Sequence, residues 1–113
     1  MDSLTPTFVG KVDTFYATIH MAGDVDHARQ IIRIVVLEGA CVQLQPCEYI
    51  YTGGLESGFT ARILSYARFP KSGDDILNQA FRLAEKLCRC LGQVSFSIET
   101  PRECAYYETS LKK

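Results

Sequence analysis

The order of two hydrophobic periodicities along the chain constrains the fold more than any other feature. In four segments apolar residues alternate with polar ones, which is typical of half-buried strands. In two others they recur every third or fourth position, which is typical of amphipathic helices. The order is strand, helix, strand, strand, helix, strand. This order predicts a single α+β domain.

The first strand and the first helix meet at a sharp boundary. Alternation from Phe15 to Met21 predicts a strand, and Asp24 predicts the N-cap of a helix from Val25 to about Glu38. Gly39 fits the position just past a helix end. The β-branched run from Ile31 to Val36 favours a strand instead. We predict the helix, because the cap, the length and the terminal glycine agree.

Two strands follow, joined by a glycine-rich turn. They run from Ala40 to Tyr51 and from Phe59 to Phe69, with Gly53, Gly54 and Gly58 between them. Pro46 has no N–H for a sheet ladder, so the first of these strands is expected at an edge or with a bend. In the second, Phe59, Ala61, Ile63, Ala67 and Phe69 are expected to face the core.

The last two segments are a long helix and a strand. Ser72 and Asp75 resemble a capping box, and a broad apolar stripe continues to about Leu91. Alternation from Gln93 to Glu99 predicts the fourth strand. The tail carries Tyr106 and Tyr107, and a short strand or a partner contact is expected there.

With right-handed crossovers, this order predicts a ferredoxin-like βαββαβ sandwich. Such a fold has a four-stranded antiparallel sheet with two helices on one face. The expected organisation is a lead-in over residues 1–13, one domain over 14–100 and a tail over 101–113. The first and third strands would be central, and the sheet's other face would be open.

Composition excludes several classes of function. The 113 residues carry a net charge of −1, which argues against a protein that holds long nucleic acid by bulk electrostatics. No apolar run is long enough to span a bilayer, and the N-terminus does not resemble a signal peptide. The five cysteines lack the spacing of a disulfide framework, which predicts free thiols in the cytoplasm.

Arginine and tyrosine side chains are expected to gather on the open face. Side chains two apart on a strand share a face, so the expected group contains Tyr16, His20, Arg62, Tyr66 and Arg68. Arginine forks suit phosphate or carboxylate, and aromatic rings can stack on a base. The group therefore predicts a site for a small anionic or nucleotide-like ligand. Alternatively, these side chains cover a sheet surface or a dimer interface.

The glycines and the histidine allow further interpretations. Gly53 and Gly54 could expose backbone N–H groups to an anion, or could serve only the geometry of a hairpin. His20 lies near Asp24 in the chain, and such a pair can do acid–base work. No nucleophile is placed by motif, so no catalytic residue is assigned. No Cys-x-x-Cys pair is present, and no metal or cofactor is expected.

Two strings of residues resemble small, largely uncharacterised phage-encoded proteins. One is Phe15 to Asp24, and the other is Ile50 to Gly54 followed by Tyr66 to Pro70. The resemblance covers about two thirds of the chain and carries no established active site. It implies a host-defence antagonist acting in the host cytoplasm, including a sponge that sequesters a nucleotide signal.

These observations predict a non-enzymatic, homo-oligomeric binding protein for a small anionic or nucleotide-like ligand. Arg62 and Arg68 would contact phosphates, Tyr66 and Tyr16 would stack or hydrogen-bond, and the turn at Gly53 and Gly54 would close over the site. Two alternatives stay open at this point. One is a protein-interaction module that inhibits a host enzyme, and the other is a small hydrolase that uses His20.

Overall fold

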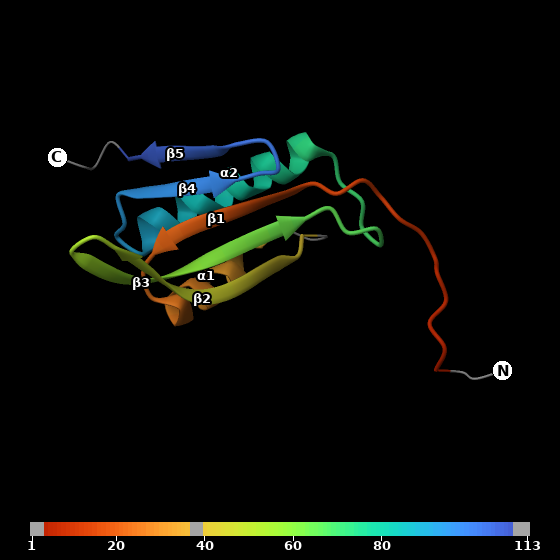
Figure 1. Ribbon diagram of the computed structural model, residues 1–113, viewed down its shortest axis with the longest axis horizontal. Helices are drawn as coiled ribbons and strands as arrows, with labels where there is room; N and C mark the ends of the chain where they lie inside the picture. Colours follow the sequence, from red (N-terminus) through yellow and green to blue (C-terminus); the bar gives the residue numbers. More distant parts are fainter. Residues whose placement is uncertain (1–3, 37–39, 110–113) are drawn as a thin grey trace.

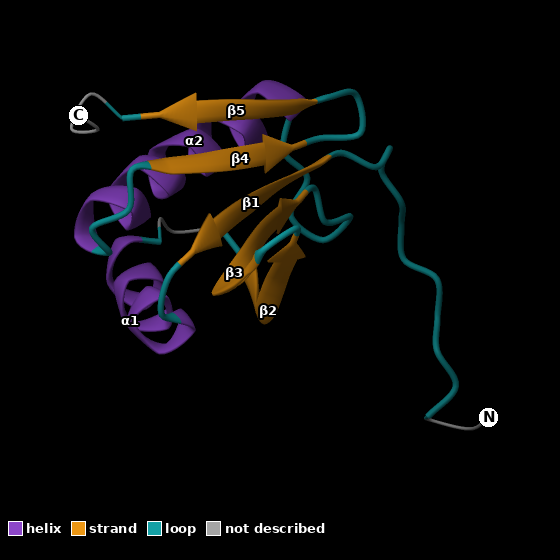
Figure 2. Ribbon diagram, turned by 60° about the vertical axis from the view of Figure 1, so that its left-hand side comes forward, coloured by secondary structure: helices purple, strands orange, loops and turns teal. Residues whose placement is uncertain are grey.

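The protein forms a five-stranded antiparallel sheet with two helices on one face (Figures 1 and 2). The computed structural model describes residues 4–36 and 40–109. The sheet order is β2-β3-β1-β4-β5. The elements are β1 (Tyr16–Ala22), α1 (Val25–Val35), β2 (Val42–Tyr51), β3 (Gly54–Leu64), α2 (Gly73–Cys90), β4 (Ser95–Glu99) and β5 (Cys104–Glu108).

The α+β class, the antiparallel sheet and the two helices are as predicted, whereas the number of strands is not. The fifth strand, β5, comes from the C-terminal tail and pairs with β4. A predicted ferredoxin-like sandwich has four strands, so that detail is not confirmed. β5 is anchored by the Tyr107 ring, whose centroid lies 5.1 Å from that of Phe96 and 5.3 Å from that of Phe81.

The core lies between the sheet and the helices and follows from strand alternation. In β1 the buried apolar side chains are Ala17, Ile19 and Met21, and in β3 they are Phe59, Ala61 and Ile63. The helices contribute apolar side chains that include Ala28, Ile32, Ile76, Ala80, Ala84 and Leu87. Because successive side chains of a strand point to opposite faces, the intervening residues of β1 and β3 lie on the sheet face away from the helices.

Both predicted helix caps are present. The Asp24 carboxylate accepts the N–H of Asp26 at 2.9 Å, and the Ser72 hydroxyl accepts the N–H of Asp75 at 3.1 Å. α1 ends at Val35, and Val36 is already extended. The predicted helix end at Glu38 and Gly39 lies outside the described residues.

β3 starts and ends earlier than predicted. Tyr51 pairs with Gly54, so the turn is short, and Gly53 sits in it with a φ of +84°. The strand ends at Leu64 because the next side chain turns the chain away from the sheet. The buried Ser65 hydroxyl donates to the Lys71 carbonyl and accepts the Lys71 N–H, at 3.0 and 3.2 Å. The prediction that the strand continues to Phe69 was therefore wrong, and Ala67 and Phe69 are exposed.

Gly58 allows β1, β3 and a tyrosine of β2 to come close together. A Cβ at this position would lie 2.4 Å from the Met21 carbonyl oxygen and 2.7 Å from Cε2 of Tyr49. The first neighbour is backbone of β1, which cannot move without disturbing the sheet. The absence of a side chain therefore lets the Tyr49 ring cross β3.

We expect Gly58→Ala to lower the free energy of unfolding by about 1–3 kcal/mol, the usual cost of overpacking a tight site. Gly10→Ala is the matched control, because nothing lies within 4 Å of its Cβ position. Urea denaturation followed by circular dichroism measures both variants. Equal stability of the two would contradict the close approach at Gly58.

Candidate functional site

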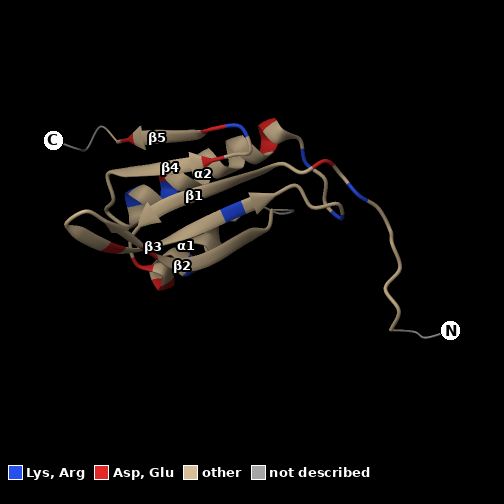
Figure 3. Cartoon of the chain, in the orientation of Figure 1, with Lys and Arg blue, Asp and Glu red and all other residues tan. Residues whose placement is uncertain are grey.

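The sheet face away from the helices, here called the open face, carries the candidate site. Cross-strand pairing places Arg62 of β3, Thr18 of β1 and Glu99 of β4 in one row. The next row contains Thr60, His20, Ser97 and Tyr106. Figure 3 shows that charged residues are sparse along these strands and do not form a patch of one sign.

His20 occupies the middle of the open face and contacts two strands. Its Nε2 lies 2.9 Å from the Glu99 Oε1, and its Nδ1 lies 3.3 Å from the Tyr49 hydroxyl. The same hydroxyl donates to the Phe59 carbonyl at 3.1 Å. Phe59 lies opposite Pro46, which has no N–H to offer. Tyr49 thus links the edge strand β2 to the histidine.

The number of hydrogen bonds that this network can form depends on whether the His20 ring carries one proton or two. If the Tyr49 hydroxyl gives its single proton to Phe59, it can only accept from His20 Nδ1–H. Nε2 must also carry a proton to bond to the Glu99 carboxylate. All three hydrogen bonds therefore form together only with a doubly protonated, cationic imidazole. With a neutral ring, Tyr49 must choose between His20 and the carbonyl.

Burial fixes the role of Tyr49 in this network. Removal from water raises the pKa of its phenol above the ordinary value of 10.0, and the neighbouring Cys47 thiol adds to the effect. The neutral form is favoured because burial penalises the phenolate. At neutral pH Tyr49 is a hydrogen-bond donor and acceptor and does not act as a base.

A second group lies toward the other end of β1. The guanidinium carbon of Arg62 lies 4.6 Å from the centroid of the Tyr16 ring, within cation–π range. Burial and the Cys41 thiol raise the pKa of Tyr66, while the Arg62 charge acts in the opposite direction. Arg62 therefore interacts with both Tyr16 and Tyr66, although Tyr66 lies beyond the end of β3.

The remaining predicted ligand residues lie apart from this group. Arg68 is exposed in the turn after β3, with its guanidinium carbon 5.2 Å from the Phe69 ring centroid. Gly53 and Gly54 lie in the turn between β2 and β3, and the nearest atoms to a Cβ on Gly54 belong to Tyr51. The predicted pairing of His20 with Asp24 is replaced by Glu99, since Asp24 caps α1 instead.

The row through Thr18 places opposite charges on either side of β1. Arg62 and Glu99 both pair with Thr18, so two strand spacings, roughly 10 Å in all, separate their backbones. Thr18 between them is 9% exposed. A ligand with a carboxylate and a cationic group could span this row.

A hollow of about 300 Å³ adjoins the histidine network. Its lining includes His20, Tyr49, Glu56, Ser97 and Tyr106. Glu99, at its side, keeps 46% of its side chain exposed, and Tyr106 is 62% exposed. The hollow is therefore open to solvent and offers aromatic, hydroxyl and carboxylate groups.

Sequence reasoning missed Tyr49, Glu56, Glu99 and Tyr106. Alternation does place Glu99 and Tyr49 on definite faces of their strands. It does not give the register that brings them to His20. Within residues 4–36 and 40–109 no group of three His, Cys, Asp or Glu side chains could hold a metal ion. All five cysteines are free. No helix among the described residues is long and apolar enough to cross a membrane.

Comparison with solved structures shows a likeness along nearly the whole chain. A phage SAM lyase in complex with S-methyl-5'-thioadenosine has a TM-score of 0.59 at 18% identity, and the match covers 98% of this chain and 100% of that one. A phage SAM lyase in the apo state has a TM-score of 0.59 at 16% identity, covering 95% and 100%. At this identity the likeness is one of fold. Neither a protein-family model nor a curated protein matches the sequence.

The comparison contradicts the expected non-enzymatic binding protein. The two solved structures named above are of an enzyme, a phage SAM lyase. The expectation rested on the arginine and tyrosine side chains of one sheet face, and the absence of a motif-placed nucleophile counted against an enzyme. A lyase can act without a nucleophilic side chain. The expectation of a small nucleotide-like ligand agrees with the comparison, since one of these solved structures contains the nucleoside S-methyl-5'-thioadenosine.

We expect Tyr49→Phe to lower the free energy of unfolding by about 1 kcal/mol, the net contribution of a part-buried hydrogen bond. His20 would lose one partner, so its ring NMR signals should shift. Tyr51→Phe is the control, because this tyrosine is exposed at the hairpin turn, and its side chain forms no hydrogen bond with the described residues of the network. Unchanged His20 signals in Tyr49→Phe would contradict the network.

Proposed function

We propose that this protein is an enzyme that cleaves S-adenosylmethionine (SAM) as a lyase and releases S-methyl-5'-thioadenosine. The observation that carries the proposal is the fold shared over 98% of the chain with a phage SAM lyase. The open face supports it, because its side chains match the parts of SAM. SAM has an α-carboxylate, an α-ammonium, a sulfonium and an adenosine group.

The charged row through Thr18 suits the amino-acid end of SAM. The Arg62 guanidinium is a donor for the carboxylate, and the Glu99 carboxylate is an acceptor for the ammonium. Their separation across β1 allows one zwitterionic group to contact both. Tyr16 holds the Arg62 side chain in place through the ring contact at 4.6 Å.

The hollow beside His20 suits the thioadenosine end. The Tyr49 and Tyr106 side chains line it and can contact a base or the sulfonium, and the Ser97 hydroxyl can bond to the ribose. Its volume of about 300 Å³ is near the lower limit for small-molecule sites. The nucleoside would leave part of its surface exposed.

The reaction balances without water. The bond between sulfur and the γ-carbon breaks, and its electron pair stays on sulfur, so the sulfonium becomes the neutral thioether of S-methyl-5'-thioadenosine. The four-carbon fragment then either closes through its own carboxylate to a lactone or loses a β-proton to form an alkene. In both routes the positive charge on sulfur disappears in the transition state.

Because the sulfonium loses its charge in the transition state, the position of a carboxylate relative to sulfur affects the reaction rate. A carboxylate directly against sulfur would stabilise the substrate more than the transition state and slow the reaction. An aromatic surface holds the cation less tightly. We therefore assign Tyr49 and Tyr106 to the sulfonium side, and Glu99 to the ammonium.

The setting of this activity follows from the likeness to phage proteins. Loss of SAM would deprive host methyltransferases and other SAM-dependent enzymes of their substrate. We therefore include an anti-defence role in the host cytoplasm in the proposal. We also include ligand binding by Tyr66, which lies next to Arg62. The self-association expected from the sequence stays a prediction.

We expect purified protein incubated with SAM to produce S-methyl-5'-thioadenosine, detected by liquid chromatography and mass spectrometry. In ¹⁸O-labelled water the oxygen on the γ-carbon of any homoserine formed should carry no label, because in the lactone route it comes from the substrate's own carboxylate. Label at that γ-oxygen would indicate a hydrolase instead, whereas label confined to the carboxylate reports only later opening of the lactone. Folded protein that gives no S-methyl-5'-thioadenosine at any SAM concentration would overturn the proposal.

Arg62→Ala should lower kcat/KM about 10- to 100-fold, which corresponds to about 1.5–3 kcal/mol for a charged hydrogen bond. Arg68→Ala is the matched control, because it removes the same charge from the turn beyond β3, and kcat/KM should stay within about twofold. Equal losses in the two variants would contradict the assignment of Arg62.

A further inference from the structure

An N-terminal arm, defined here as residues 4–12, extends away from the body of the molecule (Figures 1 and 2). It contains neither helix nor strand. Leu4 is 86% exposed, Phe8 78% and Val9 94%. Large apolar side chains gathered on an exposed segment are typical of a contact with another molecule.

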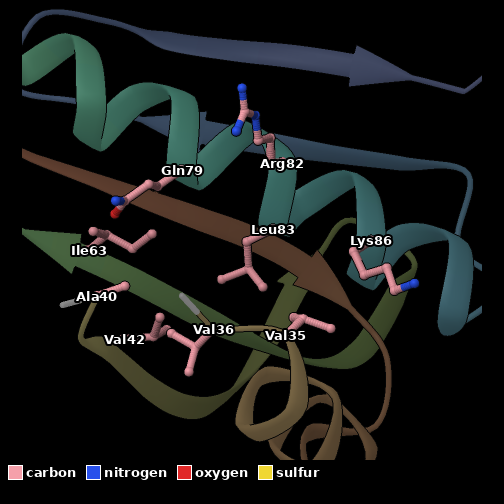
Figure 4. Close-up of a pocket in the computed structure, with 9 residues that line it drawn as sticks. All are labelled: Val35, Val36, Ala40, Val42, Ile63, Gln79, Arg82, Leu83 and Lys86. Atoms are coloured by element: carbon pink, nitrogen blue, oxygen red, sulfur yellow. The ribbon is translucent and has the colours of Figure 1, made fainter. Parts of the chain in front are cut away.

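The opposite side of the molecule from the open face has a cavity of about 340 Å³ (Figure 4). It lies where the end of α1, the middle of α2 and the adjoining parts of β2 and β3 meet. The lining is mostly apolar: Val35, Val36, Ala40, Val42, Ile63 and Leu83. Gln79, Arg82 and Lys86 of α2 complete it.

Gln79 supplies the cavity with an unused hydrogen-bond acceptor. Its Oε1 is buried and has no partner among the described residues. A buried polar group without a partner is destabilising, so a donor at this position would be stabilising. Arg82 and Lys86 are donors on the same helix, but the structure shows neither bonded to that oxygen.

The arm carries an aromatic side chain and backbone N–H donors that could occupy the cavity. Phe8 is an apolar side chain of a size that 340 Å³ accommodates. The backbone N–H groups of residues 7–12 form no hydrogen bond with the described part of the chain. An extended segment lying across the cavity would therefore bring both an aromatic anchor and a free N–H donor.

We propose that the arm of one copy docks into this cavity on a second copy. The Phe8 ring fills the apolar space, and a backbone N–H next to it donates to Gln79 Oε1. The second copy is favoured as the occupant because each chain extends its arm away from its own body. The inference does not depend on the proposed lyase activity.

The contact joins two different surfaces, so it is head-to-tail and generates a ring or an open chain of copies. The arm holds fewer than half of the roughly 20–30 residues that each side of a stable interface contributes. Assembly through the arm alone is therefore expected to be weak and to depend on protein concentration.

Photo-crosslinking tests the contact in the full chain. p-Benzoylphenylalanine replaces Phe8, and after irradiation the crosslinked peptides are mapped by mass spectrometry. We expect species of two or more chains joined from position 8 to cavity residues such as Leu83 or Val36. The same amino acid at Phe69, a half-exposed phenylalanine in a turn, is the control and should not reach the cavity.

Two variants distinguish this specific contact from non-specific association. Val36→Phe fills the rim of the cavity and should abolish the crosslink, and Phe8→Ser should reduce the solution mass measured by light scattering to that of a monomer. Phe8→Ser cannot disturb the core because Phe8 is exposed. Crosslinks within one chain or outside the cavity, no crosslinks, or an unchanged mass in Phe8→Ser would each overturn the proposal.

Discussion

Strand alternation in β1 is the constraint on which the rest of the structure depends. This strand lies in the middle of the sheet, paired with β3 and β4. Its odd-numbered residues Ala17, Ile19 and Met21 fix the helices to one face. Its even-numbered residues therefore lie on the other face of the sheet, because successive side chains alternate. The position of His20 is thus a by-product of core formation, because a slip of one residue would exchange the two sets.

The sequence predicts those features that depend on local periodicity. The two helices, their caps at Asp24 and Ser72, and the first four strands all follow from patterns within a few residues of one another. The same reasoning fails at Ser65, because alternation continues in the sequence after the chain has left the sheet. What ends β3 is a side-chain bond to Lys71, six residues away. Consequently Arg68 was assigned to a strand that it does not join.

The contacts of the candidate site could not be predicted because they depend on register between strands. Glu99 is 79 residues from His20 in the chain, and Tyr49 is 29. Nothing local distinguishes Glu99 from the nearer carboxylate of Asp24, which has a role as a helix cap. The expectation of a binding protein failed for a related reason. A search for a nucleophilic side chain overlooks lyase reactions, in which the substrate's own carboxylate can act as the nucleophile or a proton is eliminated.

The fifth strand changes where the domain ends. A chain cut after residue 100, the boundary expected from sequence, would lose β5 and with it the Tyr107 ring that stacks on Phe96 at 5.1 Å. β4 would then present a row of unpaired N–H and C=O groups at a sheet edge. Such edges recruit strands from other molecules and promote aggregation. With β5 in place the outer side of β4 is paired, and the Tyr107 side chain is packed against the core.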